Sequence, residues 1–257
     1  MLEAIHIPFR YHAGGHALSG VFHRPICHVI EAQASVNLPS IGGFARAQVE
    51  NFHAHHFVSF KSAHTHASGS KQDEDIITIN ATSVVEGLNI LGVVTADRVV
   101  SRVTSEYDRR RDGNINGNNK EGHIVALGSE FHNLRIAGHP VAIKLRHNLL
   151  LQSKTFRELQ AKLEPDKGPG KEEDIYGEVV LCSLVQDIEL GDLQGVERIG
   201  RNVLKIKHFG TISFAEVLAT AGDRTLTMMR VHLGSPDGGL LVVAESCSNG
   251  RPWPPAP

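Results

Sequence analysis

Residues 76–107 read IITINATSVVEGLNILGVVTADRVVSRVTSEY, and this stretch decides the fold class. Apolar and polar side chains alternate along both of its halves, and β-branched residues are frequent. That period of two is typical of strands with one buried face. Gly92 interrupts the pattern between the halves, as a tight turn requires. The stretch therefore predicts two long strands, Ile76–Leu91 and Val93–Tyr107, joined by a short turn.

The same alternation recurs along most of the chain. Only one segment reads as a helix, near residues 155–163, where Thr155 and Glu158 fit a capping box and Pro165 follows. We therefore predict an all-β fold, an antiparallel β-sandwich with one short α-helix; a barrel-like arrangement of the same strands fits the pattern as well. Further strands are expected at residues 30–38, 44–52, 58–68, 123–127, 129–136, 141–145, 176–185, 203–206, 210–214, 225–233 and 240–246.

The chain reads as one domain. Its 257 residues lie within the range that all-β sandwiches reach as a single unit. The stretch DGNINGNN at 112–119 predicts a loop, and PDKGPGKEED predicts a flexible connection near residues 164–174. The tail RPWPPAP, residues 251–257, cannot join a central strand because proline lacks the N–H donor. We expect a β-rich domain over residues 1–250 and a Pro-rich tail.

Composition excludes several classes of protein. A formal net charge of -2 and a pI near 6.8 argue against a dedicated nucleic-acid binder. No apolar run is long enough to span a bilayer, and the first 15 residues lack the basic start and apolar core of a signal peptide. Three cysteines, Cys27, Cys182 and Cys247, are too few for a disulfide framework, and their redox state stays open.

Familiar catalytic motifs are missing from the sequence. It contains no G-x-S-x-G elbow, no H-E-x-x-H, no Walker loop and no G-x-G-x-x-G. Acidic pairs such as Glu172 and Glu173 fall in polar loops, where carboxylates keep ordinary pKa values. We therefore predict a protein that is not an enzyme and that holds no cofactor.

Sixteen histidines are the unusual feature of the composition. His53 with His55, and His64 with His66, form two His-x-His pairs, and each pair would share one face of a strand. In a hairpin they could close around zinc or copper. In one unbroken strand, however, the two pairs have opposite parity, so a turn or bulge near His56 is required. The alternative is that these are exposed polar residues of a sheet face.

Two segments resemble a known family. They read LNILGVVTADRVVSRVTSE, residues 88–106, and GSEFHNLRIAGHPVAI, residues 128–143, and resemble the choice-of-anchor P family of bacterial proteins. The first segment of that family carries Leu-Val-Thr-Ala-Asp and the second Ser-x-Phe-x-x-Leu-x-Ile-x-Gly-x-Pro-Val. A later stretch, residues 208–233, is similar to the segment before the family's final strands, with Glu216 in place of its glutamate. The matching positions are Val94, Thr95, Ala96, Asp97, Ser129, Phe131, Leu134, Ile136, Gly138, Pro140 and Val141.

The resemblance implies a secreted or surface-displayed β-sandwich without an assigned activity, and it supplies no catalytic residues. This chain departs from the family in its richness in His, Arg and Glu, in the helix near Phe156, and in the lack of a visible signal peptide. Two hypotheses follow. The first is a non-enzymatic structural or surface protein that forms homo-oligomers through its sheet edges. The alternative is a metal-binding protein that uses the His53–His66 hairpin.

Overall fold

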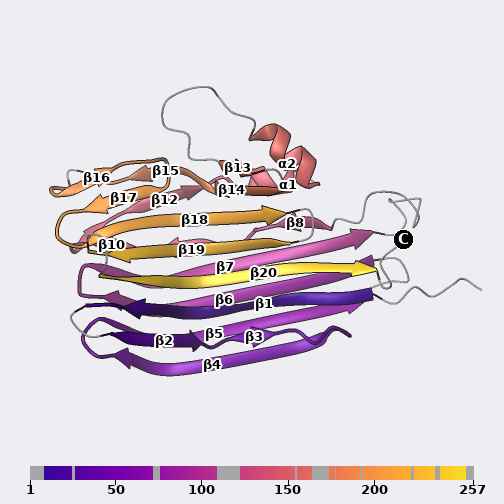
Figure 1. The fold of residues 1–257 in the computed structure, drawn as a ribbon, viewed down its shortest axis with the longest axis horizontal. Helices are drawn as coiled ribbons and strands as arrows, with labels where there is room; N and C mark the ends of the chain where they lie inside the picture. The colour runs from indigo at the N-terminus through magenta and orange to yellow at the C-terminus, as the bar shows by residue number, and fades with distance from the viewer. Residues whose placement is uncertain are drawn as a thin grey trace, which may run out of the picture.

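The computed structural model shows an all-β chain in which two antiparallel sheets pack face to face (Figure 1). It describes residues 9–24, 27–71, 76–108, 122–153, 155–163, 174–176, 178–191, 193–220, 223–234 and 238–252. The predicted loop at 112–119, residues 164–173 of the expected flexible connection, and residues 253–257 of the tail lie outside this described part.

Sheet A holds ten strands within the described residues, in the order β13-β14-β18-β19-β20-β1-β2. A hairpin of β16 and β17 adds to β18, and β3 adds to β1. Both ends of the chain meet here, because β1 pairs along its whole length with β20. The strands are β1 (Phe9–Phe22), β2 (His28–Gln33), β3 (Val36–Asn37), β13 (Asp174–Tyr176), β14 (Val179–Ser183), β16 (Val196–Arg198), β17 (Val203–Ile206), β18 (Gly210–Thr220), β19 (Arg224–Leu233) and β20 (Gly239–Pro252).

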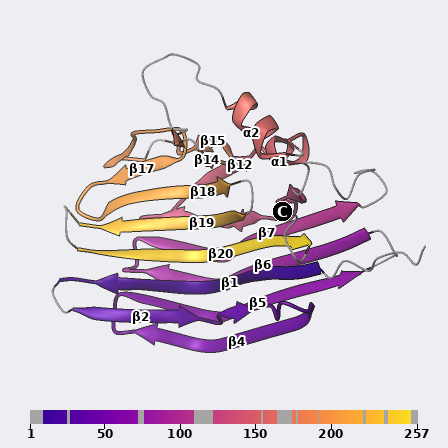
Figure 2. The ribbon, with the colours of Figure 1, turned by 45° about the vertical axis from the view of Figure 1, so that its right-hand side comes forward.

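Sheet B holds eight strands in the described chain, in the order β11-β10-β7-β6-β5-β4, with β8 and β9 also paired to β7. The strands of the two sheets run in nearly the same direction (Figure 2), as in aligned sandwiches. The elements of this half are β4 (Gly43–Ala54), β5 (Val58–Lys71), β6 (Ile76–Ile90), β7 (Val94–Asp108), β8 (His123–Val125), β9 (Glu130–His132), β10 (Arg135–Ile136) and β11 (His139–Pro140).

A small separate sheet and two helices cover one margin of the sandwich (Figure 1). The sheet pairs β12 (Ala142–Leu145) with β15 (Val185–Glu189), and the helices are α1 (Asn148–Leu151) and α2 (Phe156–Lys162). Thr155 caps α2 by accepting the Glu158 N–H at 3.1 Å, so the predicted capping box is confirmed. Helix α1 was not predicted; its single turn is too short to show a helical period. No helix among the described residues is long and apolar enough to cross a membrane.

The predicted all-β sandwich is confirmed, and the open sheets exclude the barrel-like alternative for the described strands. The expected strand at 203–206 is β17, and the one at 225–233 lies within β19. Strand β1 was not predicted, because Gly14 and Gly15 read as a loop. The glycines serve close packing: a Cβ on Gly15 would lie 2.3 Å from the Glu245 carbonyl oxygen of the neighbouring strand.

Each sheet is crossed by a row of β-bulges. In sheet B the row passes through Asn51 and Gly87, whose φ angles are 52° and 64°. In sheet A it passes through Ala215 and Ala244, with φ of 48° and 50°. A bulge adds one residue to a strand and thereby exchanges its inner and outer positions. The buried residues of β5 accordingly change parity, from Val58 and Phe60 to Ala63, Thr65 and Ala67.

The core combines large apolar side chains with a seam of buried hydroxyl groups. Phe214 of β18 meets Phe131 of β9 edge to face, with ring centroids 5.6 Å apart. Elsewhere small residues let the two sheets approach closely, and hydroxyls join them directly. Ser101 and Ser246 lie 2.6 Å apart through their Oγ atoms, and the Oγ of Ser83 donates to the His16 carbonyl at 2.7 Å. These bonds satisfy polar groups that burial would otherwise penalise.

Candidate functional site

The structure does not bring the four predicted metal-ligating histidines together. The bulge row places His53, His64 and His66 on the outer face of sheet B, so the parity objection is resolved. His53 pairs with Ser59, however, whereas His64 lies five residues further along β5. At ~3.3 Å per residue the two rings are ~16 Å apart, too far to share one ion.

His55 lies at the other end of the hairpin, in the turn after β4. Its φ of 51° places it in the left-handed region. Its ring contacts the ring of His28 on β2 edge to face at 4.9 Å, and the ring of Phe57 lies 5.9 Å away. His55 therefore joins an aromatic cluster between the two sheets and not a site with His64 and His66.

His64 and His66 remain as neighbours on the outer face of β5. Burial lowers the pKa of both imidazoles; Arg46 lowers that of His64 further, and His64 and Arg102 do the same for His66. Both rings are accordingly neutral at pH 7, the form that binds metal. Two guanidinium groups beside them nevertheless oppose a cation by charge repulsion. The arrangement does not favour a metal ion at this pair.

A polar network crosses the outer face of sheet A. His16 of β1 holds the Ser19 hydroxyl at 2.7 Å through Nε2, while Nδ1 faces the Glu245 carboxylate at 3.8 Å. Thr227 of β19 donates to the other oxygen of Glu245 at 2.7 Å. The order hydroxyl, imidazole, carboxylate is that of an activated serine, but 3.8 Å exceeds hydrogen-bond distance. In the described structure, the network chiefly ties β1, β20 and β19 together.

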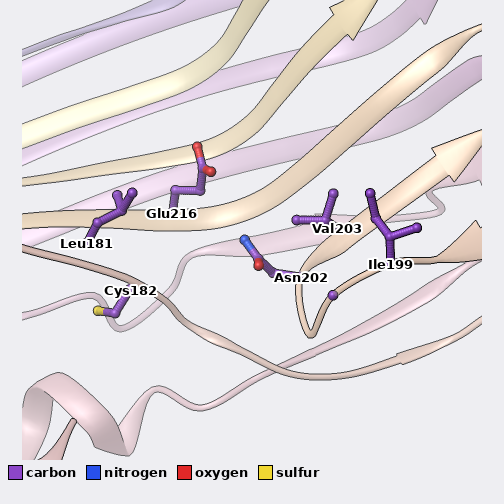
Figure 3. A pocket seen from close by; sticks show the side chains of 7 residues that line it. Leu181, Cys182, Ile199, Asn202, Val203 and Glu216 are labelled. Atoms are coloured by element: carbon purple, nitrogen blue, oxygen red, sulfur yellow. The ribbon is translucent and has the colours of Figure 1, made fainter. Parts of the chain in front are cut away.

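A hollow of about 250 Å³ lies apart from this network, between β14, β18 and the β16–β17 hairpin (Figure 3). Its polar side chains are already engaged. Glu216 accepts a hydrogen bond from Nε of Arg230 at 2.7 Å, and the Asn202 amide donates to the Phe214 carbonyl at 3.2 Å. Leu181, Ile199 and Val203 complete an apolar wall (Figure 3). Nothing in this lining supplies a free nucleophile or base.

Three other candidate ligands do lie together on the outer face of sheet A. They are His12 of β1, Asp223 just before β19, and Cys247 of β20, and their ligand atoms all lie within 4.8 Å of one another. The register explains the cluster, because His12 pairs with Asn249, and Cys247 pairs with Gly14 on one side and Thr225 on the other. The sequence gave no signal for this group, since its members are some 210 residues apart in part and share no motif.

The free edge of sheet B is the second feature that sequence reasoning anticipated. Among the described residues, β4 hydrogen-bonds to β5 alone and so leaves its other edge open. It is 12 residues long, GFARAQVENFHA, and contains no proline. Three large apolar residues near this margin are exposed: Val29 at 65%, Ile41 at 88% and Phe44 at 64%.

The comparisons with known proteins place the chain in one family. A family model described as a domain of unknown function, DUF8256, matches residues 9–168, more than half of the chain. The chain belongs to the DUF8256 family. No curated protein and no solved structure matches it. The DUF8256 segment runs from β1 through α2, so it includes His12 and all of sheet B but neither Asp223 nor Cys247.

Proposed function

We propose that this chain is a non-enzymatic β-sandwich protein that self-associates by pairing the β4 edges of two copies. The observation that carries the proposal is the open β4 edge. An unpaired strand presents a row of N–H and C=O groups that another strand can bind, and natural sheets usually protect such edges with proline, short length or inward charges. The 12 residues of β4 have none of the first two protections. A second copy of the chain offers the same edge.

The charges of β4 suit an antiparallel pair of identical strands. Arg46, Gln48 and Glu50 point outward and are exposed. Turning a second β4 end over end around Gln48 sets Arg46 of each copy opposite Glu50 of the other. Opposite charges at directly paired positions favour a sheet by about 0.2–1 kcal/mol each. The two-fold symmetry supplies two such pairs, which also fix the register.

Within one chain the same three side chains already form a line. Arg46 donates to the Gln48 side chain at 3.0 Å, and the Gln48 amide donates to Glu50 at 2.5 Å. This line holds the charged groups over β4 in the order that the second copy needs. The exposed Phe44 lies on the same strand and adds apolar area to the pair.

A surface location is part of the proposal. The resemblance to the choice-of-anchor P family supports it, because that family consists of secreted or displayed sandwiches. Assembly of identical domains through sheet edges is one way in which such proteins build structure without chemistry.

Sedimentation equilibrium and light scattering over a wide concentration range test the pairing. We expect a monomer–dimer equilibrium in the unmodified protein. Arg46→Glu sets glutamate against Glu50 twice per dimer and is expected to weaken association on the order of 10-fold. The double variant Arg46→Glu with Glu50→Arg exchanges the charges and restores the pairing.

Arg157→Glu is the matched control, since it makes the same charge change on exposed α2, at the opposite margin (Figure 1). It is expected to leave the dimer unchanged. A protein that stays monomeric at millimolar concentration contradicts the proposal. So does an exchange variant that associates no better than Arg46→Glu.

A further inference from the structure

The His12–Asp223–Cys247 cluster carries an inference independent of the β4 edge. We propose that these three side chains bind a divalent transition-metal ion, with Zn²⁺ the ion of best fit, on the outer face of sheet A. Three adjacent strands position the ligands: β1 carries His12, β20 carries Cys247, and Asp223 immediately precedes β19. One nitrogen, one oxygen and one sulfur form a mixed set of the kind that zinc accepts.

The carboxylate of Asp223 gives an observation of its own. Its Oδ1 atom is buried and makes no hydrogen bond within the described part of the chain. Leaving a buried carboxylate oxygen without a partner is costly, so such atoms usually have a donor or a cation. Burial raises the pKa of this carboxyl, and the nearby His12 opposes that rise. A cation between Asp223 and His12 would satisfy the free oxygen.

The thiol of Cys247 fits the same interpretation. Burial, together with the negative charge of Asp223, raises its pKa to about 11, so without a cation the sulfur is protonated at pH 7. A bound metal reverses this, because its charge stabilises the thiolate. Binding then breaks the S–H bond, forms a metal–sulfur bond and releases one proton to solvent. No electron is transferred, and no oxidant is required.

The geometry requires a small closure around the ion. Zinc bonds of about 2.0–2.3 Å to N, O and S hold ligand atoms roughly 3.5 Å apart in a tetrahedron. Here the three atoms lie within 4.8 Å of one another. His12 is exposed, so its ring can turn inward without displacing the core. Three protein ligands leave the fourth position to water, because the cluster lies at the surface.

The surrounding charges are compatible with a cation. Glu245, two residues from Cys247 on the same outer face, adds negative charge to the cluster's neighbourhood and raises the thiol pKa further. Arg224 follows Asp223 but is 2% exposed and alternates to the inner face of β19. His64 and His66, by contrast, lie beside two arginines on sheet B.

Metal binding by the full chain, purified without an affinity tag and stripped with a chelator, tests the proposal. Zn²⁺ titration against a competing chromophoric chelator is expected to show one ion per chain. Co²⁺ is the spectroscopic probe, and a sulfur-to-cobalt charge-transfer band is expected, since only a thiolate ligand produces it. Binding should release protons measurable in weakly buffered solution.

Three variants assign the ligands. His12→Ala removes an exposed side chain and is expected to weaken Zn²⁺ binding on the order of 10-fold or more without loss of the fold. Asp223→Asn should weaken it similarly, and Cys247→Ser should abolish the charge-transfer band. His232→Ala is the matched control, because His232 is an exposed histidine on β19 of the same sheet. It should bind Zn²⁺ as the unmodified protein does.

Two results would overturn the proposal. One is a Co²⁺ complex of the unmodified protein without a charge-transfer band, since the thiolate would then not be a ligand. The other is equal Zn²⁺ affinity in His12→Ala and His232→Ala. Because His12 is exposed, its removal decides the matter even if Cys247→Ser fails to fold.

Discussion

The two margins of the sandwich are closed in different ways. At one margin, the outer edge of β7 pairs in turn with β8, β9 and β10, and helix α2 packs Phe156 and Leu159 into the core. At the other, β4 keeps a free edge in the described chain, and Ile41 and Phe44 stay exposed near it. The covered margin gains stability from burial, whereas the open margin keeps backbone groups available for another chain. The same sandwich can therefore be stable at one side and adhesive at the other.

Removing burial at the covered margin should have the largest effect. Leu159 is fully buried on α2. Leu159→Ala leaves a cavity and is expected to lower the free energy of unfolding by about 3 kcal/mol, as measured by urea denaturation. The exposed Arg157→Ala on the same helix should stay within about 0.5 kcal/mol of the unmodified protein. A loss below about 1 kcal/mol in Leu159→Ala would show that α2 is not part of the cooperative core.

The bulge row that begins at the open margin gives the next effect. Gly87 has a φ of 64°, and a Cβ there would lie 2.6 Å from Cγ of Lys61. Gly87→Ala should therefore lower the unfolding free energy by about 1–2 kcal/mol, chiefly through left-handed strain. Asn51→Gly, at the next bulge of the row, is expected to be neutral or slightly stabilising. If both changes proved neutral, the bulge row would not be a fixed feature of sheet B.

Acidification tests the histidines beside β4. The pKa values of His64 and His66 in the folded protein lie below the ordinary 6.5, mainly because of burial. The unfolded chain therefore takes up more protons, and stability falls as the pH drops through 6.5 toward the lowered values. The loss between pH 7.5 and 5 should be below about 1 kcal/mol in total, since both rings are partly solvated.

Replacing His64 and His66 by Gln removes this part of the pH dependence. His16, whose pKa burial also lowers, remains and supplies a residual slope. Urea denaturation at several pH values checks the difference. An identical slope in the double variant would show that the outer face of β5 is better hydrated than the structure indicates.

The smallest effect on stability is expected at the open margin itself. Ile41 is 88% exposed, so Ile41→Ser should change the free energy of unfolding by less than about 0.5 kcal/mol. Phe44→Ser, at 64% exposure, should behave alike while weakening association. A large loss of stability in either monomer would mean that the two margins do not differ as described.

Alternation of side chains was enough to predict the sandwich, because most strands have one buried face. It failed for β1, whose glycines and small residues suit close sheet packing and read as a loop. It also failed for the bulges, since the positive φ of Asn51 leaves no periodic signal. For that reason the outward direction of His64 and His66 relative to His53 could not be derived from parity.

The candidate metal ligands show a different limit. His12 and Cys247 are nearly the whole chain apart, and only the register of β1 against β20 brings them near each other. Local patterns carry no information on which distant strands pair or on their offset. The predicted histidine hairpin was suggested by proximity in sequence, whereas the cluster in the structure depends on proximity between strands.

The pairing of β1 with β20 also has a consequence for how the chain folds. The first described strand finds its longest partner in the last one, so a loop of more than 200 residues must close before sheet A is complete. During synthesis, sheet B can assemble first, while β1 waits for the final strand to leave the ribosome. Truncation within β20 should therefore release both ends of the polypeptide at once, and a cell's quality control would encounter the damage as an unsealed sandwich.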